Sequence, residues 1–153
     1  MRLWTALFAF MHHLAAFTVM GALVTEHVLF APTIGASEAR KLQRIDLAYG
    51  VAALVLVAVG LARVFYFEKG AYYYFHDGWF VCKLTLFAVV GLSSIYPTMV
   101  FLSWKKSVSA GAPPAIEPSQ VRRVRLCLRV ELTAVVGILL AAALMARGYG
   151  YFG

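Results

Sequence analysis

The sequence predicts an all-α fold, a four-helix integral membrane bundle with short loops, and three observations lead to this prediction. First, 62% of the 153 residues are hydrophobic and the mean hydropathy is +0.78, whereas soluble domains are closer to half apolar. Second, the apolar residues form four blocks, each long enough for the ~20 residues that cross the hydrocarbon of a bilayer. Third, most of the lysines and arginines are concentrated in two connecting loops, which is a topology signal. We expect one transmembrane domain over residues 1–153, with spans at 3–31, 45–67, 78–103 and 124–146.

The limits of the first two spans follow from local signals. Pro32 should end the first span, because proline cannot continue a helix and restricts the residue before it. Ser37 is placed to cap a short basic helix. This helix is expected to lead into the second span, which reads IDLAYGVAALVLVAVGLARVFYF.

The third and fourth spans carry their own signals. The segment AYYYFHDG precedes the third span, and its tyrosines favour the membrane–water boundary. Asp77 is placed to cap the third span, and Pro97 within it predicts a kink or a break. Gly148 is a stop signal for the fourth span.

The charge distribution predicts partners and orientation. The net charge is +7, but the basic residues do not interleave with aromatic ones as on a nucleic-acid-binding surface. Nucleic acid is therefore excluded, and the expected partners are the lipid bilayer and a second copy or a larger membrane complex. The first and third loops hold eight basic residues: Arg40, Lys41, Arg44, Lys105, Lys106, Arg122, Arg123 and Arg125. In a bacterial inner membrane these loops would face the cytoplasm and both termini the periplasm.

Ionisable side chains inside spans are costly and usually face the bundle interior, so each is a candidate functional residue. The outer half contains His12, His13, Arg63 and Lys83, with His76 at its rim. Imidazole is a common axial ligand of haem iron, so either of the paired histidines could bind a b-type haem. The sixth ligand could be His76, Lys83 or nothing, and Arg63 would hold a propionate. Alternatively, the histidines hydrogen-bond neighbouring helices, and Lys83 pairs with a carboxylate or extends to the interface.

The inner half has a different composition. It contains Glu26, His27, Asp46, Arg129 and Glu131. One interpretation is an ion-pair cluster that fixes the helix ends, with Arg44 and Arg129 neutralising the carboxylates. The other is a proton path from the cytoplasm to an outer site, with His27, Glu26 and Glu131 as relay groups.

The spacing of the histidines limits the number of haems. His13 and His27 are fourteen residues apart, which is ~40° around a helix and ~21 Å along it. This interval resembles that of membrane b-type cytochromes, in which one helix ligates two stacked haems. Such proteins need partner histidines at both levels, and only His76 remains here. Two bis-histidine haems are therefore excluded, and one haem is still compatible with the sequence.

Several segments resemble one family. EKGAYYYFHDGWFVCKLTLF, GLSSIYPT and ALMARG are similar to a group of small four-helix bacterial membrane proteins. A fainter resemblance links the chain to the haem-containing membrane protoporphyrinogen oxidases, through FAFMHHLAAF in the first helix and GWFVCKL in the third. This resemblance implies that His12 and Lys83 are the haem-site or active-site pair. The segments TEHVLFAPT and RVELTA depart from the oxidase pattern, and RVELTA keeps only Glu131 of it.

Two functions follow as expectations. The first is a membrane haem protein that transfers electrons or oxidises a lipid-soluble or porphyrin-like substrate; its catalytic residues are left open. The second is a non-enzymatic accessory subunit without haem, packed against a larger membrane complex. Small residues on the second helix would permit such packing: Gly50, Ala52, Ala53, Gly60 and Ala62.

Overall fold

The computed structural model describes residues 2–67 and 70–152, and this part of the chain contains helices and no strands. The four long helices are α1 (Arg2–Leu29), α2 (Ala36–Ala62), α4 (Gly78–Ser103) and α6 (Pro118–Ala146). Three short segments lie between them: η1 (Arg63–Phe67), a π-helix that continues α2, α3 (Ala71–Phe75) and α5 (Lys105–Ser109). All four long helices are apolar and long enough to cross a membrane. The predicted all-α class with four spans is confirmed.

The expected basic helix does lead into the second span, and the two form one continuous helix, α2. It starts at Ala36, ahead of the predicted span at 45–67. Ser37 is not the cap; Gly35 holds that position, without a side-chain cap, and its carbonyl accepts from the Ala39 amide at 3.0 Å. Because Ala39 and Leu42 are fully buried in the core, packing favours helix through this polar stretch.

The local signals in α4 and α6 have different outcomes in the structure. Asp77 caps α4 as predicted, since its Oδ1 accepts from the amides of Trp79 at 2.9 Å and Phe80 at 3.3 Å. Helix α4 is not broken at Pro97, which is buried within it; neighbouring helices tolerate proline inside a bundle. Helix α6 starts at Pro118, ahead of the predicted membrane span at 124–146, behind a capping box at its first turn.

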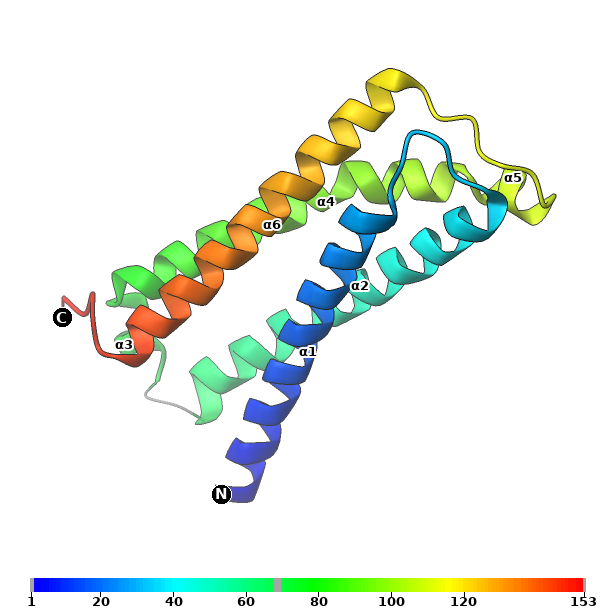
Figure 1. Cartoon of the computed structure of the whole chain (residues 1–153). Coiled ribbons are helices and arrows are strands. Elements are labelled where there is room, and N and C mark those ends of the chain that lie inside the picture. Colours follow the sequence, from blue (N-terminus) through cyan, green and yellow to red (C-terminus); the bar gives the residue numbers. More distant parts are fainter. Residues whose placement is uncertain (1, 68–69, 153) are drawn as a thin grey trace.

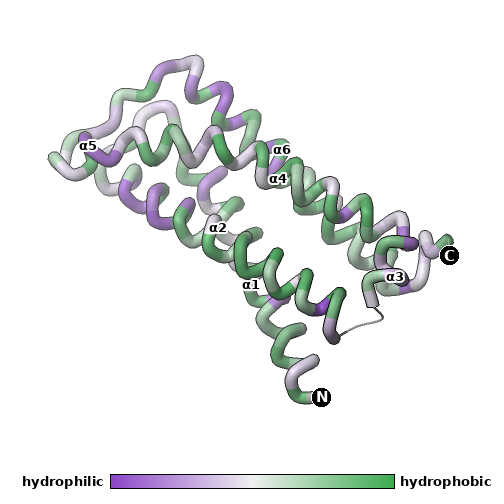
Figure 2. Tube along the Cα trace, turned by 180° about the vertical axis from the view of Figure 1, so that it is seen from behind, coloured by the Kyte–Doolittle hydropathy of each residue, from purple (hydrophilic) through white to green (hydrophobic). Residues whose placement is uncertain are grey.

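The long helices form two antiparallel pairs, α1 with α2 and α4 with α6 (Figure 1). Contacts of α2 with α4 and of α1 with α6 join the pairs, whereas the described parts of the diagonal helices are not in backbone contact. The pairs lie closest near α5 and diverge towards the termini (Figures 1 and 2). We call the end with residues 30–44 and 104–125 the basic end, and the opposite end the terminal end. Both basic loops lie at the basic end, as their shared charge predicts.

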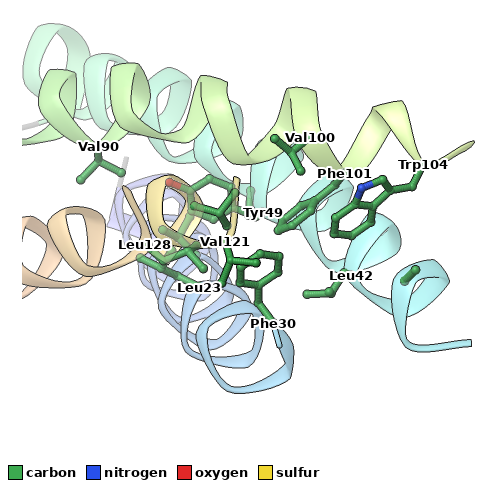
Figure 3. Close-up of a cluster of buried hydrophobic side chains, with 14 of the residues drawn as sticks. Leu23, Phe30, Leu42, Tyr49, Val90, Val100, Phe101, Trp104, Val121 and Leu128 are labelled. Atoms are coloured by element: carbon green, nitrogen blue, oxygen red, sulfur yellow. The ribbon is translucent and has the colours of Figure 1, made fainter. Parts of the chain in front are cut away.

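The buried core is concentrated towards the basic end. Phe30 stacks on Trp104, with ring centroids 6.4 Å apart, and Phe101 packs against both rings (Figure 3). By contrast, large apolar side chains such as Phe17 and Leu54 are 76% and 74% exposed on the outside. An apolar exterior of this kind is suited to lipid rather than to water.

Candidate functional site

All four long helices contribute a polar group to one buried cluster near the basic end. Tyr49 of α2 donates its hydroxyl to Glu131 Oε2 of α6 at 2.9 Å. Thr98 of α4 donates to Asp46 Oδ1 of α2 at 2.7 Å. Glu26 of α1 lies close enough to interact electrostatically with both Asp46 and Glu131. We call these five residues the carboxyl cluster.

The helical repeat explains why these carboxyl groups face inward. Glu26 follows Val19 and Leu23 on one stripe of α1, and Glu131 follows Val124 and Leu128 on one stripe of α6. Steps of three and four residues place side chains on the same helix face. Each glutamate therefore takes a position that the pattern would otherwise give to an apolar core residue.

Glu26 is the least satisfied member of the cluster. It is 1% exposed, and its Oε1 has no hydrogen-bond partner. The same holds for Oε1 of Glu131. In the described chain, no Lys, Arg or His forms an ion pair with the three carboxyl groups. Among the residues that the structure describes, the cluster therefore has no basic side chain to balance it.

Arg44 and Arg129 do not form the ion pairs with the carboxyl groups that one interpretation of the sequence predicted. Both arginines are exposed. Arg129 is two residues from Glu131, about 200° around the helix, and so points away from the cluster. His27 is partly buried beside Glu26 in the chain, and its Nδ1 has no hydrogen-bond partner.

Sequence reasoning missed Tyr49 and Thr98 as members of the cluster. Tyr49 lies three residues after Asp46, on the same face of α2, and this spacing was the available signal. Thr98 gave no signal, because its contact with Asp46 joins residues 52 positions apart.

A second group lies nearer the terminal end. It brings together His12 of α1, Arg63 at the start of η1 and Lys83 of α4, since both cations interact electrostatically with His12. The Nδ1 of His12 is buried without a hydrogen-bond partner. The His12 ring lies against Gly60 of α2, where an added Cβ would be 3.3 Å from its Cε1. We call His12, Arg63 and Lys83 the histidine–lysine site.

Asp77 adds a carboxylate at the border of this site. It is 0% exposed; its Oδ1 caps α4, and its Oδ2 has no hydrogen-bond partner. Lys83 interacts electrostatically with Asp77 and with Arg63, and its Nζ is 5.2 Å from the centre of the Phe80 ring. The sequence identified Asp77 only as a helix cap.

Of the predicted ligands, His13 does not face this site. Its side chain is exposed, and its Nδ1 is 2.6 Å from the Ala9 carbonyl of its own helix. Adjacent helical residues differ by about 100° in direction. Because His12 faces the interior, His13 lies on an exposed face of α1, with its ring edge-on to the His12 ring at 6.2 Å between centroids.

His76 belongs to a cap at the terminal end. Its ring stacks on Tyr72 at 4.1 Å, its Nδ1 is 2.8 Å from the Tyr72 carbonyl, and its own carbonyl accepts from the Phe152 amide at 3.1 Å. These contacts tie α3 to the C-terminal segment. Throughout the described residues, no group of three His, Cys, Asp or Glu side chains is arranged to hold a metal ion. An axial haem site needs only one or two protein ligands.

Together, the fold and these two groups define a helical membrane protein with four spans and polar residues buried at two depths. A family model described as "Predicted membrane protein (DUF2214)" matches residues 4–150, and the chain belongs to this family. No curated protein matches the chain, and neither does any solved structure. These comparisons give no support to the resemblance to protoporphyrinogen oxidases.

Proposed function

We propose that the protein binds one b-type haem between the helix pairs at the histidine–lysine site, with His12 as the axial ligand. The observation that carries the proposal is the His12 ring, which lies against Gly60 and hydrogen-bonds the backbone of Leu56 on α2 but leaves its buried Nδ1 without a hydrogen-bond partner, beside Arg63 and Lys83. A neutral imidazole offers one lone pair to a metal. The buried apolar core is concentrated towards the basic end, so a haem at the histidine–lysine site would not have to displace it.

Lys83 and Arg63 would supply the remaining contacts of the haem site. Lys83 is favoured over His76 as the second ligand or as an anchor for a substrate carboxylate, because His76 is engaged in the cap. Arg63 would pair with a haem propionate. A bound haem would supply one-electron chemistry, and the proposed activity is electron transfer or oxidation of a lipid-soluble or porphyrin-like substrate.

The spectrum of the purified protein tests the proposal. From haem-replete cells we expect a Soret band that shifts on reduction by dithionite. His12→Ala should lose the haem, whereas the matched variant His13→Ala should retain it because His13 faces outward. A colourless wild-type protein, or full haem retention by His12→Ala, would overturn the proposal.

The carboxyl cluster suggests an accompanying proton-transfer role. Charge balance in a low-dielectric interior requires protons or a bound cation near its three carboxyl groups, and no metal-binding arrangement is present among the described residues. We propose that Glu26 exchanges protons there. Infrared spectroscopy of the reconstituted protein should show a protonated carboxyl band that Glu26→Gln reduces and that Glu38→Gln, near the start of α2, leaves unchanged. Equal bands in both variants would argue against this role.

The accessory-subunit alternative has a different signature. Gly60 is already covered by His12 of the same chain, whereas nothing lies within 4 Å of a Cβ added at Gly50. A partner helix would therefore pack near Gly50. A colourless protein that co-purifies with a larger complex, and loses it on Gly50→Leu, would favour this alternative.

We also propose that the protein resides in a bacterial inner membrane with the basic end in the cytoplasm. A reporter enzyme active only in the periplasm, fused after residue 153, should then be active. An inactive C-terminal fusion, together with an active one inserted in the loop between α5 and α6, would reverse the orientation.

A further inference from the structure

An open apolar groove runs along the outside of the α1–α2 pair. Its volume is about 440 Å³. Helix α1 lines it with Met11, Leu14, Ala15 and Thr18, and α2 contributes six residues between Arg44 and Val55. On α2 this stretch is about 16 Å long at 1.5 Å per residue. The groove is therefore elongated in the direction in which lipid chains lie.

The groove ends at Arg44, beside a basic hollow. This second hollow has a volume of about 270 Å³, and its lining includes Arg40, Arg44 and Lys105. Arg44 and Leu47 line both depressions, so the apolar groove and the basic hollow share one border. An apolar groove with cations at one end is complementary to a molecule that has an acyl chain and an anionic head group.

Arg44 is available to such a head group. It is exposed and forms no hydrogen bond or ion pair with the described chain. By contrast, Arg40 already donates to the Val108 carbonyl at 3.0 Å, which holds its guanidinium at the rim. The surrounding cations of the basic end add a positive field that favours anionic lipids over zwitterionic ones.

We infer that the groove between α1 and α2 is a binding site for one anionic phospholipid, with an acyl chain along the groove and the phosphate at Arg44. The acyl chain would lie against Leu14, Leu47 and Val51, deeper in the membrane than the head group. Lys105 and Arg40 would face the remaining charge of the head group. This site is on the outside of the bundle and does not depend on a haem.

Binding of two short-chain lipids with identical tails tests the inference. We would measure adducts of the full-length protein by native mass spectrometry, with phosphatidylglycerol and phosphatidylcholine as probes. The wild type should prefer phosphatidylglycerol. Arg44→Ala should bind it about five-fold more weakly, which corresponds to ~1 kcal/mol per basic residue near the head groups, and should lose most of the preference.

Two further variants separate the head group from the chain. Arg123→Ala removes an exposed cation at the same end but outside both hollows, and should behave as the wild type. Ala48→Phe fills the groove and should weaken both lipids equally. No preference in the wild type, or equal effects of Arg44→Ala and Arg123→Ala, would overturn the inference.

Discussion

The hydrogen bond between Tyr49 and Glu131 should stabilise the bundle more than a typical polar contact in a membrane protein. The bond is 2.9 Å long and joins α2 to α6, which have no backbone contact in the described chain. Tyr49→Phe removes only the hydroxyl and keeps the ring in the core. The hydroxyl also interacts with Ser94 of α4, so the variant removes both contacts, and the double-mutant cycle below separates the part that belongs to Glu131.

Two magnitudes bracket the expected effect. Hydrogen bonds measured in membrane helices average about 0.6 kcal/mol, whereas leaving a buried polar group unsatisfied costs about 1–3 kcal/mol. Glu131 is 1% exposed and its Oε1 already lacks a partner. Without Tyr49 its carboxyl group would have no hydrogen bond, and water cannot readily replace it. We therefore expect Tyr49→Phe to cost about 1.5 kcal/mol, near the upper range for membrane proteins.

Unfolding in mixed micelles of increasing SDS content, followed by circular dichroism, measures this free energy. Tyr66→Phe is the matched control, because Tyr66 is 80% exposed and should change stability by less than about 0.5 kcal/mol. A double-mutant cycle with Glu131→Met should return a coupling of about 1 kcal/mol. Additive effects of the two substitutions, or equal effects of the two tyrosine variants, would refute the reasoning.

Three other predictions concern packing, capping and the end of α6. Phe101→Ala should destabilise the same transition by about 3 kcal/mol, because it opens a cavity under Phe30 and Trp104; an effect as small as that of the lipid-facing Phe17→Ala would contradict the core assignment. Asp77→Ala should cost about 1 kcal/mol and speed hydrogen exchange at the first amides of α4, whereas Asp77→Asn keeps an acceptor oxygen and should preserve them. Gly148→Ala should cost about 1 kcal/mol, since φ is +77° there, as judged by SDS unfolding. Equal stability of Gly148→Ala and the wild type would count against a left-handed backbone conformation at position 148.

The sequence alone determined the features that depend on near neighbours along the chain. Four apolar blocks predicted four helices because a lipid-embedded backbone must satisfy its hydrogen bonds internally. Asp77 and Gly148 marked helix ends by local chemistry: the Tyr149 amide bonds to the Leu144 carbonyl at 3.2 Å across Gly148, as the stop signal requires. The basic stretch after Ser37 was predicted to be helical and to lead into the second span, and α2 is continuous there, with Ala39 and Leu42 buried.

Only the tertiary structure decided which polar groups meet. Tyr49 and Glu131 are 82 residues apart, and nothing local specifies their contact. His12 and His13 are adjacent histidines, and helix spacing alone does not say which of them faces the interior; the packing of α1 against Gly60 selects His12. Arg129 was predicted to neutralise Glu131, but the two residues are about 200° apart around α6, so Arg129 points outward when Glu131 is buried. Helix formation is set by local hydrogen bonds and hydrophobicity, whereas the direction in which each helix face points is set by its neighbours.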